Sequence, residues 1–496
     1  MIKKGFDNDE YIKRQGAEIR KRINEFGGKL YLEFGGKLFD DHHASRVLPG
    51  FMPDTKLSML CSLSDDIEIV IVVNSGDIER NKKRSDIGIT YDLDVLRLID
   101  AFRAINLYVG SVVISQYKGQ ASARIFKEKL ERLGIKVYIH QSIPNYPTDL
   151  PNIVSENGFG KNDYIETKAP LVVVTAPGPG SGKMATCLSQ LYHEHIRGNK
   201  AGYAKFETFP IWNLPLKHPV NLAYEAATSD LNDVNMIDPY HLEAYGKTAV
   251  NYNRDVEVFP VLNAMFEKIY GESPYKSPTD MGVNMAGFCI CDDEVCRKAS
   301  LDEIIRRYFA ALVHKRLGNG SDSEISKLEL LMKQANISVE DRAVVSAALE
   351  KSKQTENQPA TAIMLPNGKI VTGKNSKLLG ASSAALLNAV KLACGVDDEI
   401  ELIKPEVIAP IQQLKTGFLG NHNPRLHTDE TLIALAISAA TSKDAAKCLE
   451  GLKELKGSEA HSTVILSQVD LDVYRKLGIN LTCEPQHQTH KLYHKK

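Results

Sequence analysis

The sequence predicts an α/β protein with a mostly parallel, doubly wound N-terminal sheet, a helical middle segment and a second, smaller α/β domain. Up to about residue 207, apolar runs of strand length alternate with helical patterns. Residues 219–355 then hold helical patterns and few strand runs, and strand patterns return after residue 360. Near-continuous apolar strands separated by helices are typical of a parallel sheet that is buried on both faces.

The strands of the N-terminal sheet are predicted by short apolar runs that are rich in β-branched residues. We expect them at 67–73, 108–114, 136–139, 171–176 and 201–207. Helical periodicity predicts helices at 9–26, 92–105, 119–134 and 184–197. In KLYLEFGGKLF (29–39), two apolar runs flank Gly35-Gly36, which predicts a β-hairpin.

The pattern along the chain predicts three domains, at 1–215, 216–355 and 356–496. Residues 351–360 are polar and contain Pro359, which predicts a linker. Helices are expected in the middle part at 257–271, 301–318, 322–335 and 338–354. In the last part, strands are expected on both sides of a Pro-Asn-Gly turn within 360–373 and at 399–403, 462–466 and 479–483, with helices at 382–395, 405–415, 428–441 and 443–453.

Charge and composition exclude several classes of protein. The 496 residues carry 61 Lys+Arg and 62 Asp+Glu, a net charge of −1, which provides no overall field for nucleic acid or an anionic membrane. No apolar run reaches the roughly 18 residues that span a bilayer. The first residues, MIKKGFDNDEYIKRQ, contain no apolar signal core. We therefore expect a cytoplasmic protein without nucleic-acid or membrane partners.

The eight cysteines are too sparse for a disulfide framework, so we expect reduced thiols. Only Cys289, Cys291 and Cys296 cluster, with the spacing C-x-C-x4-C. A closed zinc site needs four ligands, and neither a second cysteine pair nor H-x3-H follows nearby. No metal site is expected there.

The clearest functional motif is LVVVTAPGPGSGKMATCLSQLYH (171–193), which runs from a strand through a Gly-rich loop into a helix. Glycines let the backbone approach an anion, and the helix start offers unpaired N–H groups and a partial positive charge. The motif predicts binding of a phosphate group, with a tight turn that holds no ligand as the alternative. The expected phosphate-binding residues are Gly178, Gly180, Ser181, Gly182 and Lys183.

The loop departs from the Walker A pattern G-x4-G-K-[ST]. Pro177 and Met184 stand where this pattern requires Gly and Ser or Thr. The hydroxyl that normally holds Mg²⁺ is therefore missing, unless Ser181 or Thr186 supplies it. Whether Mg²⁺ takes part stays open.

A second reading of the same loop is a dinucleotide-binding turn. Gly180-x-Gly182-x-x-Ala185 fits the pattern G-x-G-x-x-A, and the next strand ends in Glu207, which could meet a ribose hydroxyl. The expected ligand is therefore a nucleotide or another small phosphate-bearing molecule.

Other candidate residues come from the loops that follow neighbouring strands. Parallel strands end at one edge of a sheet, where ligands bind, and this places the loops at 74–77, 115–118 and 140–142 beside the Gly-rich loop. Asp77 and His140 are therefore candidates for acid–base catalysis. The alternative for His140 is a structural, polar residue at a strand end.

Two histidine-containing segments are weaker candidates. His42 follows Asp40-Asp41 and precedes Arg46, and we include it as a third candidate catalytic residue, with a polar turn as the alternative. Near the C-terminus, His427, Asp429, Glu430 and His461 lie close to the ends of expected elements and predict a possible second site. The alternative there is that Thr428 or Asp429 caps the helix that follows.

Long stretches of the chain have a familiar pattern. They are LYLEFGGKLFDDHHASRVLPGF (30–51), KRSDIGITYDLDVLRLID (83–100), VVVTAPGPGSGKMATCLSQLYHE (172–194), AGYAKFETFPIWNLPLKHPVNLAYEAATSDL (201–231), NPRLHTDE (423–430) and AHSTVILSQVD (460–470). Through them the whole chain resembles a bacterial family known as domain of unknown function 1846. The resemblance implies a two-part α/β protein with a helical insert and a C-terminal part similar to the cytidine-deaminase-like fold. It implies no established activity, and the zinc-deaminase pattern H-x-E…P-C-x-x-C is absent from the sequence.

Two functions of different classes remain open. The first is an enzyme that binds a phosphorylated substrate at 177–183 and takes its catalytic groups from the neighbouring loops. The second is a non-catalytic nucleotide sensor or assembly protein, in which the same loop binds the ligand. We expect a homo-oligomer in either case.

Overall fold

The computed structural model describes residues 3–35, 38–39, 41–84, 88–231 and 233–488. The chain divides into two compact units. The N-terminal unit comprises Lys4–Glu225 and Asn232–Arg297, and the C-terminal unit comprises Met1–Lys3, Ala226–Leu231 and Lys298–Lys496. The division into three domains at residues 215 and 355 stays a prediction. Within the described residues, no helix is long and apolar enough to cross a membrane.

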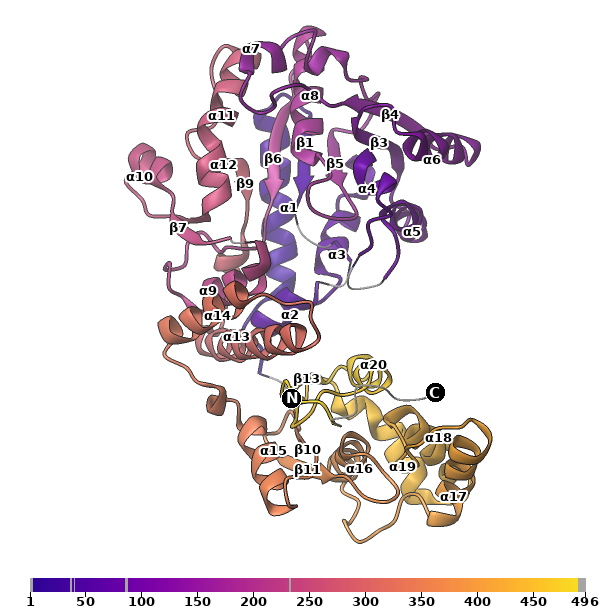
Figure 1. Ribbon diagram of the computed structural model, residues 1–496. Coiled ribbons are helices and arrows are strands. Elements are labelled where there is room, and N and C mark those ends of the chain that lie inside the picture. Colours follow the sequence, from indigo (N-terminus) through magenta and orange to yellow (C-terminus); the bar gives the residue numbers. More distant parts are fainter. Residues whose placement is uncertain (1–2, 36–37, 40, 85–87, 232, 489–496) are drawn as a thin grey trace. The chain divides into compact units, whose positions relative to one another are not determined.

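The N-terminal unit contains a seven-stranded parallel sheet, which confirms the α/β prediction (Figure 1). The strand order is β4-β3-β2-β5-β1-β6-β9, and every neighbouring pair is parallel. The strands are β1 (Leu30–Phe34), β2 (Ile67–Asn74), β3 (Val109–Tyr117), β4 (Lys136–Gln141), β5 (Leu171–Thr175), β6 (Gly202–Phe206) and β9 (Gly282–Val283).

Helices cover both faces of this sheet. Successive side chains of each strand point to opposite faces, so the apolar strands contribute to a core on each side. Along β2, Ile69 and Ile71 pack on one face and Val70 and Val72 on the other. The first face is covered by α1 (Asn8–Glu25), α3 (Thr55–Cys61), α5 (Tyr91–Ala104) and α6 (Ala121–Arg132). The second is covered by α7 (Leu150–Ile153), α8 (Lys183–Ile196), α11 (Asn253–Tyr270) and α12 (Pro278–Met281).

The strand order creates a topological switch point between β2 and β5. From β2 the chain continues outward to β3 and β4, whereas from β5 it crosses to β6 and then β9 on the opposite side. Ligands of open α/β sheets bind outside the carboxyl ends of the strands at such a point. The Gly-rich loop follows β5 and therefore lies at this position.

The hairpin predicted at Gly35-Gly36 is wrong. β1 lies in the centre of the sheet, where it pairs in parallel with β5 on one side and β6 on the other, so no antiparallel partner can join it. All five of its residues are buried. Gly36 itself lies outside the described residues.

Shorter elements complete this part of the chain. They are α2 (His42–Val47), α4 (Ser75–Glu79), α9 (Pro219–Ala227), β7 (Asn235–Ile237), α10 (Pro239–Tyr245) and β8 (Val250–Tyr252). Strands β7 and β8 form a small antiparallel pair.

The C-terminal unit is built on a four-stranded mixed sheet of order β11-β10-β12-β13. Its strands are β10 (Ala360–Met364), β11 (Ile370–Lys374), β12 (Glu459–Ser462) and β13 (Asn480–Cys483). β10 is antiparallel to both of its neighbours, and β12 and β13 are parallel. The cytidine-deaminase-like resemblance of this unit stays a prediction.

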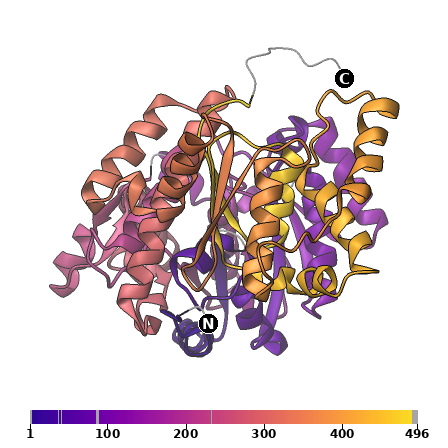
Figure 2. The same cartoon turned by 90° about the horizontal axis from the view of Figure 1, so that it is seen from below.

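Helices also lie on both sides of the smaller sheet (Figure 2). Ile363 of β10 packs into a core built mainly from α16 to α20, whereas its neighbour Ala362 contacts Val344 and Ala348 of α15. From residue 293 to the end of the described chain, the helices are α13 (Asp293–Arg316), α14 (Asp322–Ala335), α15 (Ala343–Gln354), α16 (Ala381–Cys394), α17 (Pro405–Gln413), α18 (Thr428–Ala439), α19 (Lys443–Glu450) and α20 (Gln468–Lys476).

Two strand predictions in this unit need correction. Residues 399–403 form a turn and loop between α16 and α17, in which Leu402 and Ile403 are buried and anchor the loop to the core. The strand predicted at 462–466 ends at Ser462 and begins earlier, at Glu459. Both errors have the same cause: buried side chains that anchor a loop give the same short apolar pattern as a strand.

Candidate functional site

The Gly-rich loop is held in place by β2 and β3, the two strands that lie on one side of β5. Asn74, at the end of β2, donates from Nδ2 to the carbonyl oxygen of Gly180 at 3.2 Å. Ser115 of β3 donates from Oγ to the carbonyl oxygen of Ser181. Because side chains bind the carbonyl groups from one side, the loop is fixed at the carboxyl edge of the sheet.

Three positions of the loop require glycine. Gly180 and Gly182 have φ angles of +73° and +90°, in the left-handed region that glycine adopts without strain. At Gly178, a Cβ atom would lie 2.3 Å from the hydroxyl oxygen of Tyr91. The sequence therefore encodes this loop shape residue by residue.

Backbone N–H groups of the loop and of the first turn of α8 lack hydrogen-bond partners in the described chain. Among the described residues, no hydrogen bond takes up the N–H of Gly178 or of any residue from 180 to 185. Gly182 is the N-cap of the 14-residue helix α8 and provides no side-chain cap. A helix start with unpaired N–H groups carries a partial positive charge and binds anions.

Side chains add to this anion-binding character. Lys183 is partly exposed and forms no ion pair or hydrogen bond with the described part of the chain. The hydroxyl groups of Ser181 and Thr186 are buried and lack hydrogen-bond partners there. These two hydroxyls are the ones that could replace the missing Walker A hydroxyl.

Asp77 lies at the same edge of the sheet, in α4 directly after β2. Its carboxylate is buried and forms ion pairs with Arg80 at 2.7 Å and Lys82 at 3.5 Å. The ammonium group of Lys82 also lies 5.0 Å from the centre of the Tyr91 ring, which borders Gly178. Asp77 is therefore next to the loop, and its negative charge is already balanced by two cations.

His140 is the next-to-last residue of β4 and is buried, with 3% of its surface exposed. Its Nε2 lies 3.1 Å from the carbonyl oxygen of Asp163. Burial lowers the pKa of His140 to about 4, so the imidazole is neutral at pH 7. These contacts fit the structural alternative, and a catalytic role for His140 stays a prediction.

His42 is exposed at the first position of α2. The preceding Asp41 accepts a hydrogen bond from the N–H of Ala44 at 3.1 Å and pairs with Lys56 at 2.7 Å. The next residue, His43, packs edge-on against Phe209. The contacts around His42 are therefore structural, and its catalytic role is untested.

A cluster of buried charges, of which the sequence singled out only Glu207, lies at the end of β6. The ammonium group of Lys205 contacts the carboxylate of Asp255 and the hydroxyl of Tyr252, and it lies 2.9 Å from Oε1 of Glu207. We call Lys205, Glu207, Asp255 and Tyr252 the β6 cluster. Its members come from β6, the residue directly after β6, β8 and α11, and their side chains are largely buried.

Burial and the neighbouring charges shift the pKa values of two members of the β6 cluster. Burial raises the pKa of Glu207 to about 7, with Asp255 acting in the same direction and Lys205 against it. Burial also opposes the charge of Lys205, but Asp255 and Glu207 outweigh it and raise the pKa of the ammonium group. Glu207 is thus a carboxyl group that titrates near neutral pH.

The β6 cluster and the Gly-rich loop lie on the same edge. β5 and β6 flank β1, and adjacent strands are about 4.8 Å apart, so the two strand ends are separated by roughly 10 Å. Between them, Glu33 of β1 accepts a hydrogen bond from the hydroxyl of Tyr203 at 2.8 Å.

Metal ligands are not gathered anywhere in the described residues, since no group of three or more His, Cys, Asp or Glu side chains is placed to hold an ion. All eight cysteines are free thiols. In the predicted cluster, Cys289 and Cys296 are buried and their Sγ atoms lie 3.4 Å and 3.3 Å from backbone carbonyl oxygens.

Comparison with known proteins finds matches over almost the entire chain. The model of the family described as "Domain of unknown function DUF1846, N-terminal" matches residues 4–336, and that described as "Domain of unknown function DUF1846, C-terminal" matches residues 340–493. A UPF0371 protein of Streptococcus thermophilus is 58% identical over 495 residues, which cover 100% of both chains. A UPF0371 protein of Streptococcus pyogenes serotype M5 is 57% identical over 490 residues, 99% of each chain.

Proposed function

We propose that this chain, which belongs to the DUF1846 family as its sequence motifs indicated, binds a small phosphate-bearing molecule at residues 178–183. The observation that carries this proposal is the run of unpaired N–H groups at the start of α8, next to Lys183. This run lies at the topological switch point of a parallel sheet, where such ligands bind.

The phosphate oxygens would accept hydrogen bonds from the free N–H groups, and Lys183 would add a charge. Both kinds of contact favour a dianionic phosphate over a neutral ligand. The hydroxyls of Ser181 and Thr186 are buried at the same place, and either of them could also meet a phosphate oxygen or a phosphate-bound Mg²⁺. A nucleotide is the ligand class that best fits the extent of the edge, since its far end would approach Glu33 and the β6 cluster.

The enzyme reading is supported by Glu207. General acid–base catalysis is most efficient when the pKa of the catalytic group is close to the working pH, and that of Glu207 is about 7. In this reading, Lys205 and Asp255 position the carboxyl group and share its proton. The non-catalytic reading, a nucleotide sensor or oligomeric assembly protein, uses the same phosphate site without Glu207.

Titration calorimetry with inorganic phosphate, sugar phosphates, nucleoside phosphates and NAD, each with and without Mg²⁺, tests the proposal. Lys183→Ala should weaken phosphate binding by about 1–3 kcal/mol, the range for a charge-assisted hydrogen bond. Lys129→Ala, an exposed lysine on α6, is the matched control and should leave binding unchanged. Equal affinity of wild type and Lys183→Ala for every phosphate ligand would refute the site.

The two readings are separated by turnover of whichever ligand binds. If the protein is an enzyme, Glu207→Gln should abolish turnover while leaving binding nearly intact, because the amide keeps the shape but cannot transfer the proton. Binding without turnover in the wild-type protein would favour the sensor.

A further inference from the structure

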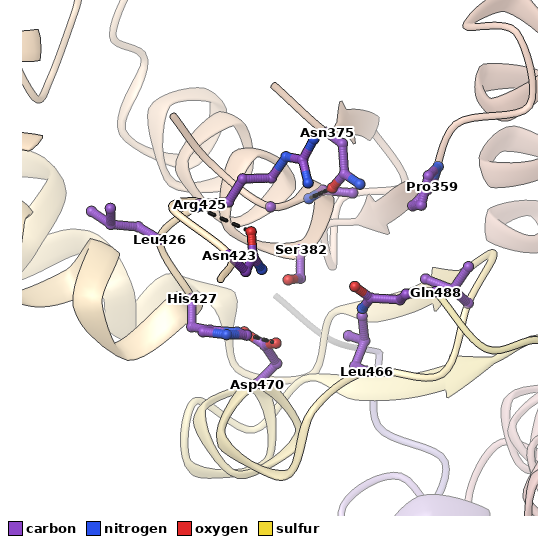
Figure 3. A pocket seen from close by; sticks show the side chains of 13 residues that line it. Pro359, Asn375, Ser382, Asn423, Arg425, Leu426, His427, Leu466, Asp470 and Gln488 are labelled. Atoms are coloured by element: carbon purple, nitrogen blue, oxygen red, sulfur yellow. Dashed lines mark hydrogen bonds and ion pairs between the residues drawn. The ribbon is translucent and has the colours of Figure 1, made fainter. Parts of the chain in front are cut away.

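The C-terminal unit contains a polar pocket at the start of α16, far along the sequence from the Gly-rich loop. Asn375, Ser382, Asn423, Arg425, His427 and Gln488 line it on its polar side (Figure 3). Leu426, Val464 and Leu466 contribute apolar surface. Of the C-terminal residues that the sequence suggested, His427 lines this pocket, whereas His461 is buried in β12.

The start of α16 leaves hydrogen-bond donors unused. Asn375 accepts from the N–H of Ala381 at 2.8 Å, but no described residue accepts from the N–H of Ser382 or Ser383. Gly380, the N-cap of this 14-residue helix, has no side chain to cap them. These N–H groups carry the partial positive charge of the helix start.

Ser382 gives an independent sign of a ligand. The residue is 96% buried, with 4% of its surface exposed, and its hydroxyl has no hydrogen-bond partner in the described part of the chain. Figure 3 shows this hydroxyl directed into the pocket between Asn423 and His427. A buried polar group without a partner is costly, and a bound ligand would satisfy it.

Two basic side chains face the same space. Arg425 donates from Nε to the carbonyl oxygen of Ser376 at 2.7 Å, which fixes the guanidinium group and leaves its two terminal nitrogens without partners among the described residues. The Nδ1 of His427 lies 3.1 Å from Oδ2 of Asp470, so Nε2 is the nitrogen left for a ligand.

The one carboxylate that lines the pocket is occupied by other donors. Asp470 accepts from the hydroxyl of Ser467 at 2.7 Å, and from the N–H and the hydroxyl of Thr428 at 2.9 Å and 3.0 Å, in addition to His427. Although burial acts in the opposite direction, these hydrogen bonds lower the pKa of Asp470 to about 2. Asp470 therefore orients His427 and stays ionised, and its lone pairs are turned toward donors of the protein.

We propose that this pocket is a second ligand site, which binds the phosphate group of a small molecule through Ser382, Ser383, Arg425 and His427. The N–H groups of the two serines and the hydroxyl of Ser382 contact the phosphate oxygens. Arg425 provides a paired set of donors, the geometry with which guanidinium groups recognise phosphate. The apolar wall of Leu426, Val464 and Leu466 receives the uncharged part of the ligand.

The test uses the full-length chain in the Lys183→Ala background, so that the Gly-rich loop does not dominate the signal. Inorganic phosphate is titrated by calorimetry into this protein and into versions that also carry Arg425→Gln or Ser382→Ala. We expect affinity to fall about tenfold or more with Arg425→Gln and about three- to tenfold with Ser382→Ala, as lost charge-assisted and neutral hydrogen bonds would produce. Arg475→Gln, on the exposed side of α20, is the matched control and should change nothing.

Two results would overturn the proposal. The first is phosphate binding that neither Arg425→Gln nor Ser382→Ala weakens, in proteins whose circular dichroism and melting temperature match the parent. The second is the absence of phosphate binding to the Lys183→Ala protein at millimolar concentration. Ser382→Ala removes one oxygen atom only, so it keeps the test decisive if Arg425→Gln fails to fold.

Discussion

Replacing Lys205 by methionine should strongly destabilise the N-terminal unit. In the wild-type protein the ammonium group contacts Asp255 and Tyr252 and lies 2.9 Å from Glu207, all largely buried. Methionine has a similar volume, so the change removes the charge and leaves little cavity. Two carboxyl groups then remain buried without a counter-charge, and breaking a buried pair in this way costs about 3–5 kcal/mol.

The assay is urea unfolding followed by tryptophan fluorescence. The chain has one tryptophan, Trp212, which lies in the same unit as Lys205 and donates from Nε1 to the carbonyl oxygen of Asn284. With a slope of about 2 kcal/mol per molar urea, the expected loss lowers the midpoint by roughly 2 M. Lys217→Met, an exposed lysine of the same unit, should change stability by no more than about 0.5 kcal/mol.

The loss should depend on pH in a definite direction. A carboxyl group whose pKa is higher in the folded than in the unfolded protein costs stability as the pH rises from the unfolded to the folded pKa; the cost is complete above the folded value and vanishes below the unfolded value. Glu207 is such a group, and without Lys205 its pKa loses the influence that opposes burial and Asp255. The destabilisation should therefore be largest above pH 7 and shrink toward pH 4, and Lys205→Met combined with Asp255→Asn should recover part of it. A midpoint equal to wild type at pH 8, or a loss that grows on acidification, would refute the reasoning.

Three further predictions concern the C-terminal unit. Gly373→Ala should prevent stable folding of this unit, since the new Cβ would lie 2.2 Å from a backbone nitrogen of α16; a melting temperature equal to wild type would contradict this. His427 has a pKa raised by its hydrogen bond to Asp470, with burial opposing, so its stabilisation is present below about pH 6.5 and lost as the pH rises through the raised value. Removing the imidazole with His427→Gln should abolish this pH dependence in thermal melts; the charge of Lys415 lowers the pKa of His427 and that of Glu430 raises it. Limited proteolysis should give a stable C-terminal fragment, and its first residue decides between the linker predicted at 351–360 and the gap between the two family matches at 336–340.

The N-terminal sheet could be predicted because buried parallel strands are continuous apolar runs. Ile67–Asn74 and Leu171–Thr175 are such strands, and the Gly-rich loop between β5 and α8 is encoded by adjacent residues. The hairpin prediction at Gly35-Gly36 is wrong because a local turn signal carries no information about which strands pair. The partners of β1 are β5 and β6, which lie about 140 and 170 positions further along the chain in the register Leu30↔Leu171 and Leu30↔Gly202.

The β6 cluster could not be assembled from the sequence, because its members are separated by about 50 positions. Lys205 interrupts the apolar pattern of a buried strand, and a buried lysine requires a partner. That signal indicates that an acidic residue must be close in space, but only the fold shows that it is Asp255. The same holds for the C-terminal pocket, where His427 was a candidate from its place near a helix start and Ser382 and Asp470 gave no local sign of meeting it.

The central claim is that phosphate binds to the N–H groups that begin α8. A crystal structure determined with a bound nucleotide, or with inorganic phosphate, tests it most directly. We expect phosphate oxygens within about 2.7–3.2 Å of backbone nitrogens between Gly180 and Met184, with Lys183 in contact with the same group. Density for the ligand elsewhere on the chain, with the loop empty at a concentration that saturates binding in solution, would contradict the claim.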